Sequence, residues 1–360
     1  MRHILLALAM LACTSTTVEP PVSDPSATRS YRMGFSAFPP APVIARAVAN
    51  LSMWTARADA AIIHVEPPWA AMLSGEPLAD IARREFEWQV AQFRARGMDV
   101  VVIIDATNGV DRTSESDALV TAGRSITEPA VQALYREWAR TLVAQIKPVA
   151  LGLAAETNLI RLAAPARVYS ALVQMTNATA AAVRADAPAL PLFITIQVET
   201  AWGRLQGGTT FIGVEQDFRD FPFTQMIGLS SYPYLGGFQE PAEMPDDWYT
   251  RPLAGRTLPS LITEGGWTSA NVAATATLRA ITSSPEKQAR WFARQMQLAD
   301  RLAPRYLFQL QFSDIDLAAF NLVDDPRLLP FARLGLVDMA LTPRPALAVW
   351  DAAFARRYAP

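Results

Sequence analysis

Eight short apolar segments recur along this chain, and longer amphipathic segments separate most of them. Their near-continuous hydrophobicity is typical of parallel strands that are covered on both faces. We therefore predict strands at 31–36, 58–65, 99–105, 149–155, 190–197, 226–231, 259–264 and 306–312.

Most gaps between these segments place apolar residues at the three- and four-residue spacing of a helix. In one of them, Leu134, Trp138 and Leu142 fall on a single face. The pattern predicts helices over 81–96, 131–146, 168–183, 287–302 and 346–357. The gap after the fifth strand has room only for a short helix, and three prolines favour a loop after the sixth.

Strand and helix alternating eight times predicts an α/β protein with a single (βα)8 TIM barrel. An open doubly wound sheet is the main alternative. We favour the barrel because the count is eight and because polar residues recur at C-terminal strand ends, where barrel enzymes place their chemistry. Those polar residues are Ser36, His64, Glu66, Asp105, Asn108, Glu156, Asn158, Gln197, Glu199, Tyr232, Glu264, Gln311 and Asp314.

The N-terminal residues have a different character. Arg2 and His3 precede an apolar run, 4–12, that stops at Cys13. A bilayer crossing needs about 20 apolar residues, so this run is too short to span, but it suits a secretion signal. The end of the run, Met-Leu-Ala-Cys, resembles the lipobox of bacterial lipoproteins, which implies lipidation of Cys13. An ordinary cleaved signal or an inert leader is the alternative.

The chain thus divides into three predicted parts. Residues 1–13 are a lipoprotein-type signal, 14–30 are a Ser-, Thr- and Pro-rich flexible tether, and 31–360 are the barrel domain. We expect an exported protein of the bacterial cell envelope that touches the membrane only through its N-terminal lipid.

Composition excludes several classes of function. The net charge is −2 without a basic cluster, so no nucleic-acid partner is expected. Cys13 is the only cysteine, and His64 is the only histidine after the leader, which excludes disulfides within the chain and multi-His zinc sites. No P-loop or Gly-x-Gly-x-x-Gly sequence is present. We expect a monomer without a cofactor.

Two of the strand-like segments end on a glutamate, Glu156 in 152–158 and Glu264 in 261–267. A carboxylate at the end of a buried strand is costly unless it has a partner or a function. Two carboxyl groups on one barrel rim suit hydrolysis of a glycosidic bond, which needs one on each side of the scissile bond. The alternative is that both glutamates pair with arginines at the barrel mouth.

Three segments resemble a large clan of retaining (βα)8 glycoside hydrolases. Ile-Thr-Glu-Gly-Gly-Trp at 262–267 looks like the clan's nucleophile segment, and Ser-Ser-Tyr-Pro-Tyr at 230–234 is similar to its sixth-strand segment. The residues at 335–350 resemble the closing segment of the endo-galactanase and mannanase-like branches. The resemblance implies a carbohydrate partner, namely a β-linked poly- or oligosaccharide cleaved with retention.

The resemblance also implies roles for particular residues. Glu156 would be the acid/base, Glu264 the nucleophile, and Tyr232 the hydrogen-bond donor to that nucleophile. Most of the clan has Asn before the acid/base, where this chain has Ala155. The contact to the sugar 2-hydroxyl would then come from elsewhere.

Aromatic residues in the predicted βα loops suit sugar binding, because the C–H faces of sugar rings are apolar. Trp248 lies in such a loop, and the alternative is that each tryptophan packs its own loop. His64 could line the substrate cleft, and the alternative is that it is a structural histidine whose hydrogen bonds are satisfied within the protein. The predicted substrate contacts are Asn158, Gln197, Trp202, Trp267, His64, Trp69 and Phe312.

Two other functions stay open at this point. A catalytically inactive barrel that only binds glycan would explain Ala155 as an early sign of decay. A lyase or aldolase barrel lacks an obvious Schiff-base lysine, since Lys147 precedes the fourth strand and Lys287 lies in a helix. The loops around 106–127, 199–213 and 235–257 carry no readable code for the sugar.

Overall fold

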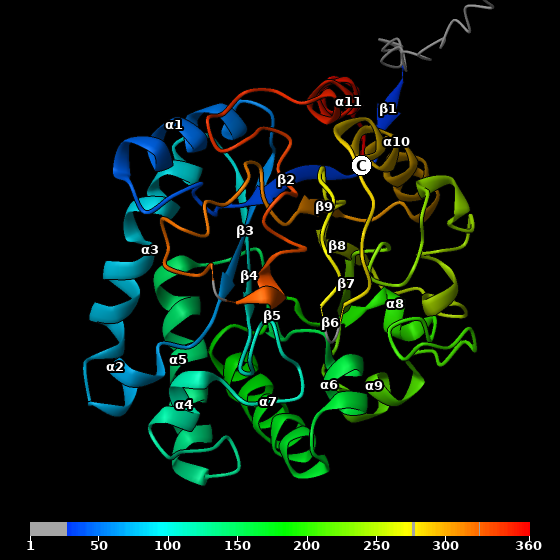
Figure 1. The fold of residues 1–360 in the computed structure, drawn as a ribbon. Coiled ribbons are helices and arrows are strands. Elements are labelled where there is room, and N and C mark those ends of the chain that lie inside the picture. Colours follow the sequence, from blue (N-terminus) through cyan, green and yellow to red (C-terminus); the bar gives the residue numbers. More distant parts are fainter. Residues whose placement is uncertain (1–26, 276–277, 324) are drawn as a thin grey trace, which may run out of the picture.

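The computed structural model describes residues 27–275, 278–323 and 325–360. Its centre is a closed barrel of eight parallel strands in chain order (Figure 1). The strands are β2 (Arg32–Ser36), β3 (Ala60–Val65), β4 (Asp99–Ile104), β5 (Ala150–Ala154), β6 (Leu192–Gln197), β7 (Met226–Ser231), β8 (Ser260–Gly265) and β9 (Tyr306–Gln309). Because β9 pairs with β2, the sheet has no free edge, and the predicted (βα)8 barrel is confirmed.

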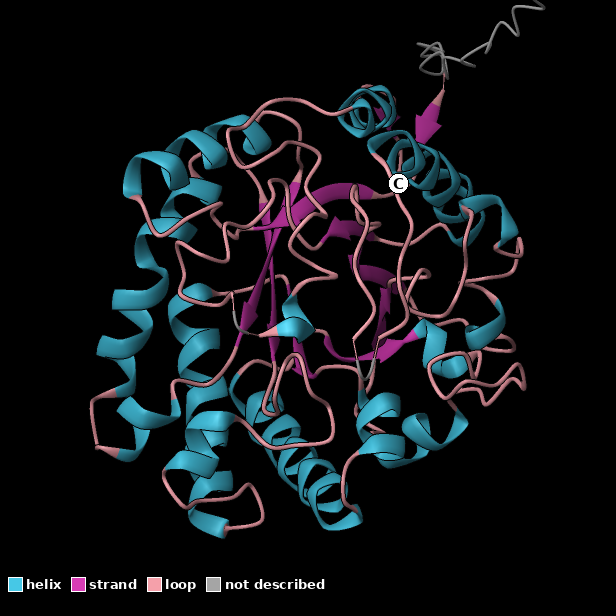
Figure 2. Ribbon diagram, in the orientation of Figure 1, coloured by secondary structure: helices cyan, strands magenta, loops and turns pink. Residues whose placement is uncertain are grey.

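Helices surround the barrel (Figure 2). They are α1 (Ile44–Thr55), α2 (Trp69–Leu73), α3 (Leu78–Arg94), α4 (Asp117–Thr121), α5 (Pro129–Ile146), α6 (Thr157–Ala163), α7 (Ala166–Asp186), α8 (Val198–Ala201), α9 (Glu215–Asp220), α10 (Pro285–Leu302) and α11 (Pro345–Phe354). The loop after β7 holds only two short 3-10 turns, η1 (Pro241–Glu243) and η2 (Arg251–Leu253). The sequence pattern did not single out α1, whose first residue, Ile44, is 84% exposed and blurs the apolar face.

Alternate residues of each strand point into the barrel or outward against the helices. Ala60 and Ile62 of β3 belong to the inner cluster, whereas their neighbours Ala61 and Ile63 belong to the outer core. This two-residue period places the side chain of His64 on the inner side, at the C-terminal end of β3. The barrel therefore directs polar residues at its strand ends toward a common mouth.

A two-stranded parallel sheet joins the two ends of the described chain. It consists of β1 (Thr28–Arg29) and β10 (Arg357–Tyr358). Arg29 donates to Asp59 at 2.6 Å, so the last residues of the predicted tether belong to the folded unit. Cys13 and the predicted signal lie outside the described residues.

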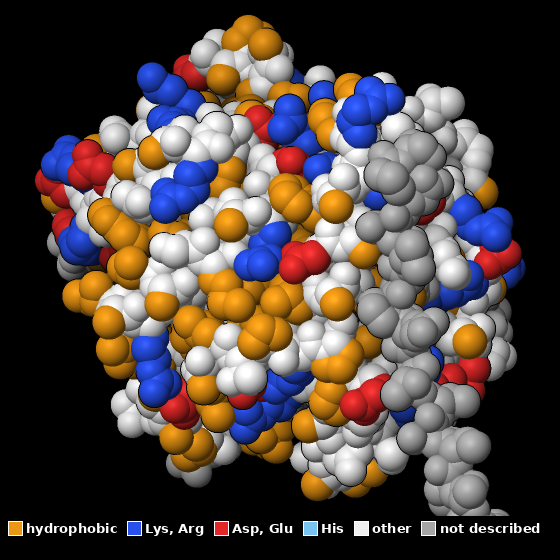
Figure 3. Space-filling view, turned by 90° about the horizontal axis from the view of Figure 1, so that it is seen from above, with side chains coloured by type: hydrophobic (Ala, Val, Ile, Leu, Met, Phe, Trp, Pro, Cys, Tyr) orange, Lys and Arg blue, Asp and Glu red, His pale blue; other side chains and the backbone are white. Residues whose placement is uncertain are grey.

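Among the described residues, no helix has both the length and the apolar character needed to cross a membrane. The face at the top of Figure 1 is shown in Figure 3. Positive and negative side chains are interspersed around an apolar area in the part of this face where described residues are visible.

Candidate active site

A β-bulge in β8 precedes Glu264. Leu229 pairs with Ile262, but the next residue, Ser230, pairs with Glu264, so Thr263 is an extra residue in β8. Ile262 packs in the outer core, and simple alternation would turn the carboxylate two residues later outward as well. The bulge re-aims Glu264 toward the barrel mouth, as bulges near active sites commonly do.

A second bulge lies in β5 before Glu156. Gly152 pairs with Phe193, and Ala154 pairs with Ile194, which leaves Leu153 as the extra residue. Glu156 then takes a left-handed backbone conformation, with φ of 46°, and caps the N-terminus of α6. A non-glycine residue in this region costs about 1 kcal/mol or more, so the surrounding structure must hold it there.

Glu264 accepts hydrogen bonds from the barrel mouth. The hydroxyl of Tyr232 donates to Oε2 at 3.0 Å. His64 Nδ1 lies 3.4 Å from Oε1. Burial lowers the pKa of His64 to about 4, so this imidazole is neutral at pH 7 and its contact with Glu264 is not an ion pair. Nε2 of His64 is buried and has no partner among the described residues.

Glu156 has stronger partners. Arg112 Nε donates to Oε2 at 2.9 Å, and the Ser230 hydroxyl donates to Oε1 at 2.6 Å. The backbone N–H of Glu156 donates to Thr195 Oγ1 at 2.8 Å. Arg112 also donates through Nη1 to Asp105 at 2.5 Å. The alternative interpretation of the sequence expected both glutamates to pair with arginines, and among the described residues Glu156 has such a partner whereas Glu264 does not.

Ser230 brings the two carboxyl groups close together. Its hydroxyl oxygen lies 2.6 Å from Glu156 Oε1 and 3.5 Å from Glu264 Oε2. Those two carboxylate oxygens therefore lie no more than about 6.1 Å apart, the total of the two distances. Because a hydroxyl has a single proton, Ser230 donates to the nearer oxygen, that of Glu156.

Burial sets the protonation of the pair. It raises the pKa of both Glu156 and Glu264, and the charge of Glu264 raises that of Glu156 further. The nearby guanidinium of Arg112 opposes both shifts. Burial alone would lower the pKa of Arg112, but the carboxylates of Asp105 and Glu156 raise it, so this side chain stays cationic.

Two residues predicted to contact the substrate form hydrogen bonds within the protein at the ends of the strands. Asn158 is fully buried; its amide donates to the backbone oxygen of Gln197 at 2.9 Å and accepts from its backbone N–H at 2.8 Å. The side chain of Gln197 donates to Glu199 and accepts from Thr200. These amides tie the ends of β5 and β6 together and are engaged by the protein itself.

Most of the aromatic side chains predicted to bind sugar are packed within the protein. Trp69, Trp267 and Phe312 are at most 1% exposed. Trp202 is partly exposed, and it stacks on the buried Trp248 with ring centroids 5.1 Å apart. Of the tryptophans predicted to contact substrate, only Trp202 therefore offers surface to a ligand.

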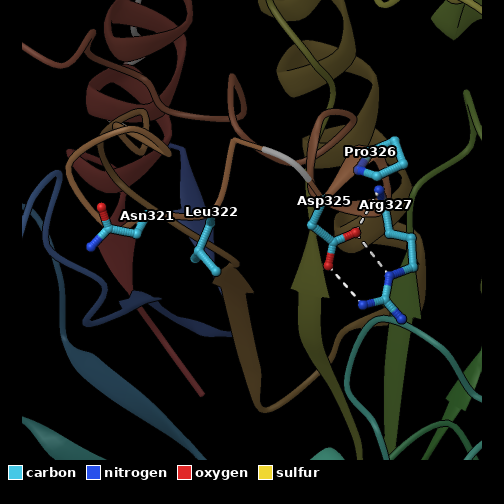
Figure 4. Close-up of a pocket in the computed structure, with 5 residues that line it drawn as sticks. All are labelled: Asn321, Leu322, Asp325, Pro326 and Arg327. Atoms are coloured by element: carbon cyan, nitrogen blue, oxygen red, sulfur yellow. Dashed lines mark hydrogen bonds and ion pairs between the residues drawn. The ribbon is translucent and has the colours of Figure 1, made fainter.

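The connection from β9 to α11 covers one side of the mouth. The ring of Phe331 packs edge-on against Tyr232 at 5.0 Å, and the hydroxyl of Tyr234 donates to Pro330 at 3.1 Å. A cavity of about 480 Å³ lies in this connection, beside the ion pair of Asp325 and Arg327 shown in Figure 4. Neither Glu156 nor Glu264 lines it.

Sequence reasoning did not single out Arg112 or the role of Ser230. Arg112 lies in the irregular loop between β4 and α4, which carries no periodic signal. Ser230 was part of the segment that carried the family resemblance, yet only its contacts reveal its position between the two glutamates. Asp314, another residue at the strand ends, is buried in ion pairs with Arg333 and Arg344.

Within the described residues, no group of three or more His, Cys, Asp or Glu side chains is arranged to hold a metal ion. No protein-family model matches the chain, and no curated protein matches it. Solved structures do.

An exo-β-1,4-mannosidase from Opitutaceae bacterium strain TAV5 is 14% identical with a TM-score of 0.61; 93% of this chain aligns, spanning only 62% of that protein. The GH53 catalytic domain of Ignisphaera aggregans is 13% identical with a TM-score of 0.61, covering 93% of this chain and 98% of that one. Xylanase 10B from Thermotoga maritima is 12% identical with a TM-score of 0.55, covering 90% and 95%. At such identities these likenesses show that this chain has the same (βα)8 barrel fold.

Proposed function

We propose that this protein is a retaining glycoside hydrolase that cleaves a β-linked poly- or oligosaccharide by double displacement. The observation that carries the proposal is the placement of Glu156 and Glu264 on either side of Ser230, with their nearest oxygens at most about 6.1 Å apart. Retaining enzymes hold their two carboxyl groups about 5–5.5 Å apart, whereas inverting enzymes need about 6.5–9.5 Å to admit a water.

In the first step, the Glu264 carboxylate attacks the anomeric carbon, and Glu156 donates a proton to the departing glycosidic oxygen. In the second step, Glu156 removes a proton from water, which attacks the same carbon and releases Glu264. Tyr232 stabilises the ionised nucleophile, because its hydroxyl donates to Glu264. The fold shared with a mannosidase and a xylanase supports the proposal only by analogy.

A mechanism-based label tests this proposal. An activated aryl 2-fluoro-β-glycoside should leave its sugar on the protein, and peptide mapping should place the added mass on Glu264. The Glu264→Gln variant, treated with the same reagent, is the control and should gain no mass. A panel of β-galactan, β-mannan and β-glucan oligosaccharides then identifies the sugar. Label on another residue, or full activity of Glu264→Gln, would rule out the assigned roles.

The second candidate is a catalytically inactive barrel that binds glycan. Its support is the ion pair of Arg112 with Glu156, which favours the ionised form of the group that must begin as an acid. In that case the panel would show binding without labelling or turnover.

We also propose that the protein is exported and anchored in the cell envelope through a lipid on Cys13. The support is the sequence 2–13, with its basic start, short apolar run and terminal cysteine. Incorporation of labelled palmitate into the wild-type protein, and its loss in Cys13→Ala, is the expected result.

A further inference from the structure

Arg112 is a buried cation placed against the candidate acid. Its residue surface is 8% exposed. Nη1 donates to Asp105 at 2.5 Å, to Thr107 Oγ1 at 3.2 Å and to the backbone oxygen of Asn108 at 3.2 Å. These contacts hold one edge of the guanidinium to its own loop. The other edge faces Glu156 through Nε.

That second edge is only half used. Within the described residues Nη2 donates no hydrogen bond. This nitrogen is not completely shielded from solvent, and it flanks the Nε that contacts Glu156. The Nε and Nη2 donors of an arginine form a planar fork that fits a carboxylate or another oxyanion with two parallel hydrogen bonds.

The proposed chemistry makes this edge significant. Glu156 must carry a proton before it can act as an acid, and a protonated Glu156 no longer balances the charge of Arg112. Asp105 remains as one partner, but the Nε and Nη2 edge then has no anion. A buried cation that loses a charged partner is strongly destabilised unless another anion replaces it.

We infer that the mouth of the barrel binds a β-linked glycan whose sugars carry an anionic group, and that this group takes the Nε and Nη2 edge of Arg112 in place of Glu156. The inference rests on the proposed function for the role of Glu156. As the substrate anion forms its ion pair with Arg112, one proton from solvent adds to the Glu156 carboxylate. No covalent bond other than that O–H bond forms, and the net charge of the site and its ligand after binding equals that of the empty site.

Binding calorimetry with three β-1,4-linked tetrasaccharides tests the inference, using units of glucuronate, glucose or glucosamine. These probes share a linkage and differ in charge. In the Glu264→Gln background, which prevents turnover, the glucuronate probe should bind at least tenfold more tightly than the glucose probe. Repeating the titration in buffers with different ionisation heats should reveal uptake of about one proton per site.

Two variants separate Arg112 from general charge effects. Arg112→Gln combined with Asp105→Asn removes the guanidinium together with the loop carboxylate that it pairs with, and it should reduce the preference for glucuronate to within twofold. Arg327→Gln removes the same charge from an arginine that is paired with Asp325, and it should keep the preference.

Equal affinities, tighter binding of the glucosamine probe, no binding of any probe, or a preference that survives loss of Arg112 would each overturn the inference. Failure of the proposed function would be distinguishable from these results. It would appear as the absence of a covalent label on the wild-type protein, whereas calorimetry requires no turnover.

Discussion

The hydroxyl of Tyr232 donates a 3.0 Å hydrogen bond to Glu264, and both groups are buried at the mouth of the barrel. Burial raises the pKa of this glutamate, and the tyrosine hydrogen bond acts in the opposite direction. Tyr232 therefore helps to keep the proposed nucleophile ionised.

Tyr232→Phe should lower kcat/KM by about tenfold to 100-fold, because a hydrogen bond to a charged group contributes about 1.5–3 kcal/mol. It should also move the acidic limb of the pH profile to higher pH, since the pKa of Glu264 rises when the donor is lost. Initial rates on an aryl β-glycoside from pH 4 to pH 9 measure both effects.

Tyr234→Phe is the matched control. Tyr234 is equally buried, but its hydroxyl donates to the backbone of Pro330 and not to a glutamate. The acidic limb of this variant should coincide with that of the wild type. An unshifted acidic limb in Tyr232→Phe would contradict the role given to Tyr232.

Ser230→Ala should change the other limb of the profile. The serine hydroxyl donates to Glu156 and lowers its pKa, although burial raises that pKa overall. Without this donor the pKa of the proposed acid should rise, and the alkaline limb should move up by about one pH unit. The same pH series of kcat/KM gives the result.

Ser231→Ala provides the control for that change. The Ser231 hydroxyl donates to Glu199 at 2.7 Å and makes no hydrogen bond to Glu156 or Glu264. Its alkaline limb should stay in place. If Ser231→Ala shifted the limb as far as Ser230→Ala, a general disturbance of β7 would explain both.

Much of the fold follows from the sequence because its signals are local. The eight apolar runs are strands within two residues of their predicted bounds, except that β9 ends three residues before the predicted 312. The polar ends of β3, β5, β7 and β8 meet at the mouth as barrel geometry requires. His64, Glu156, Tyr232 and Glu264 were identified in this way. Their catalytic and binding roles stay predictions.

The bulges and the loop contacts have no such signal. Leu153 continues the apolar run of its strand, and Thr263 is a residue type common in strands, so nothing in the pattern marks a shift of register. The position of Arg112 depends on hydrogen bonds within an irregular loop. Tryptophans in loops give the same sequence pattern whether they pack inward, as Trp267 does, or face a ligand.

Glu199 should make the stability of the protein depend on pH. This side chain is fully buried, and burial raises its pKa from 4.5 to about 7. Between these pH values the native state keeps a proton that the unfolded chain releases. The free energy of unfolding should therefore fall as pH rises from 4.5 to 7, by about 3 kcal/mol from this group.

Glu199→Gln should remove that part of the pH dependence and be more stable than the wild type at pH 8. Urea unfolding at pH 5 and pH 8 gives the difference for each protein. Glu87→Gln, an exposed position on α3, should behave like the wild type. Equal differences for the wild type and Glu199→Gln would show that Glu199 does not titrate as expected.

Glu156→Ala should separate the two chemical steps of the proposed reaction. General acid catalysis contributes about 10²–10⁴-fold, so hydrolysis of an unactivated glycoside should fall by that factor. A dinitrophenyl glycoside needs no proton on its leaving group, and the first step of its cleavage should stay near the wild-type rate. Azide should then accelerate turnover, because a small anion fits the space beside Nε of Arg112 that the carboxylate vacates.

The anomeric configuration of the azide product shows from which face of the sugar the nucleophile attacks. If Glu264 forms the covalent intermediate, azide attacks from the side that Glu156 occupied and yields a β-glycosyl azide with retained configuration. Proton NMR of the anomeric centre measures this directly. An α-glycosyl azide would mean direct displacement without a glycosyl-enzyme. Equal losses on both substrates without azide rescue would mean that Glu156 supports the mouth through Arg112 and does not transfer a proton.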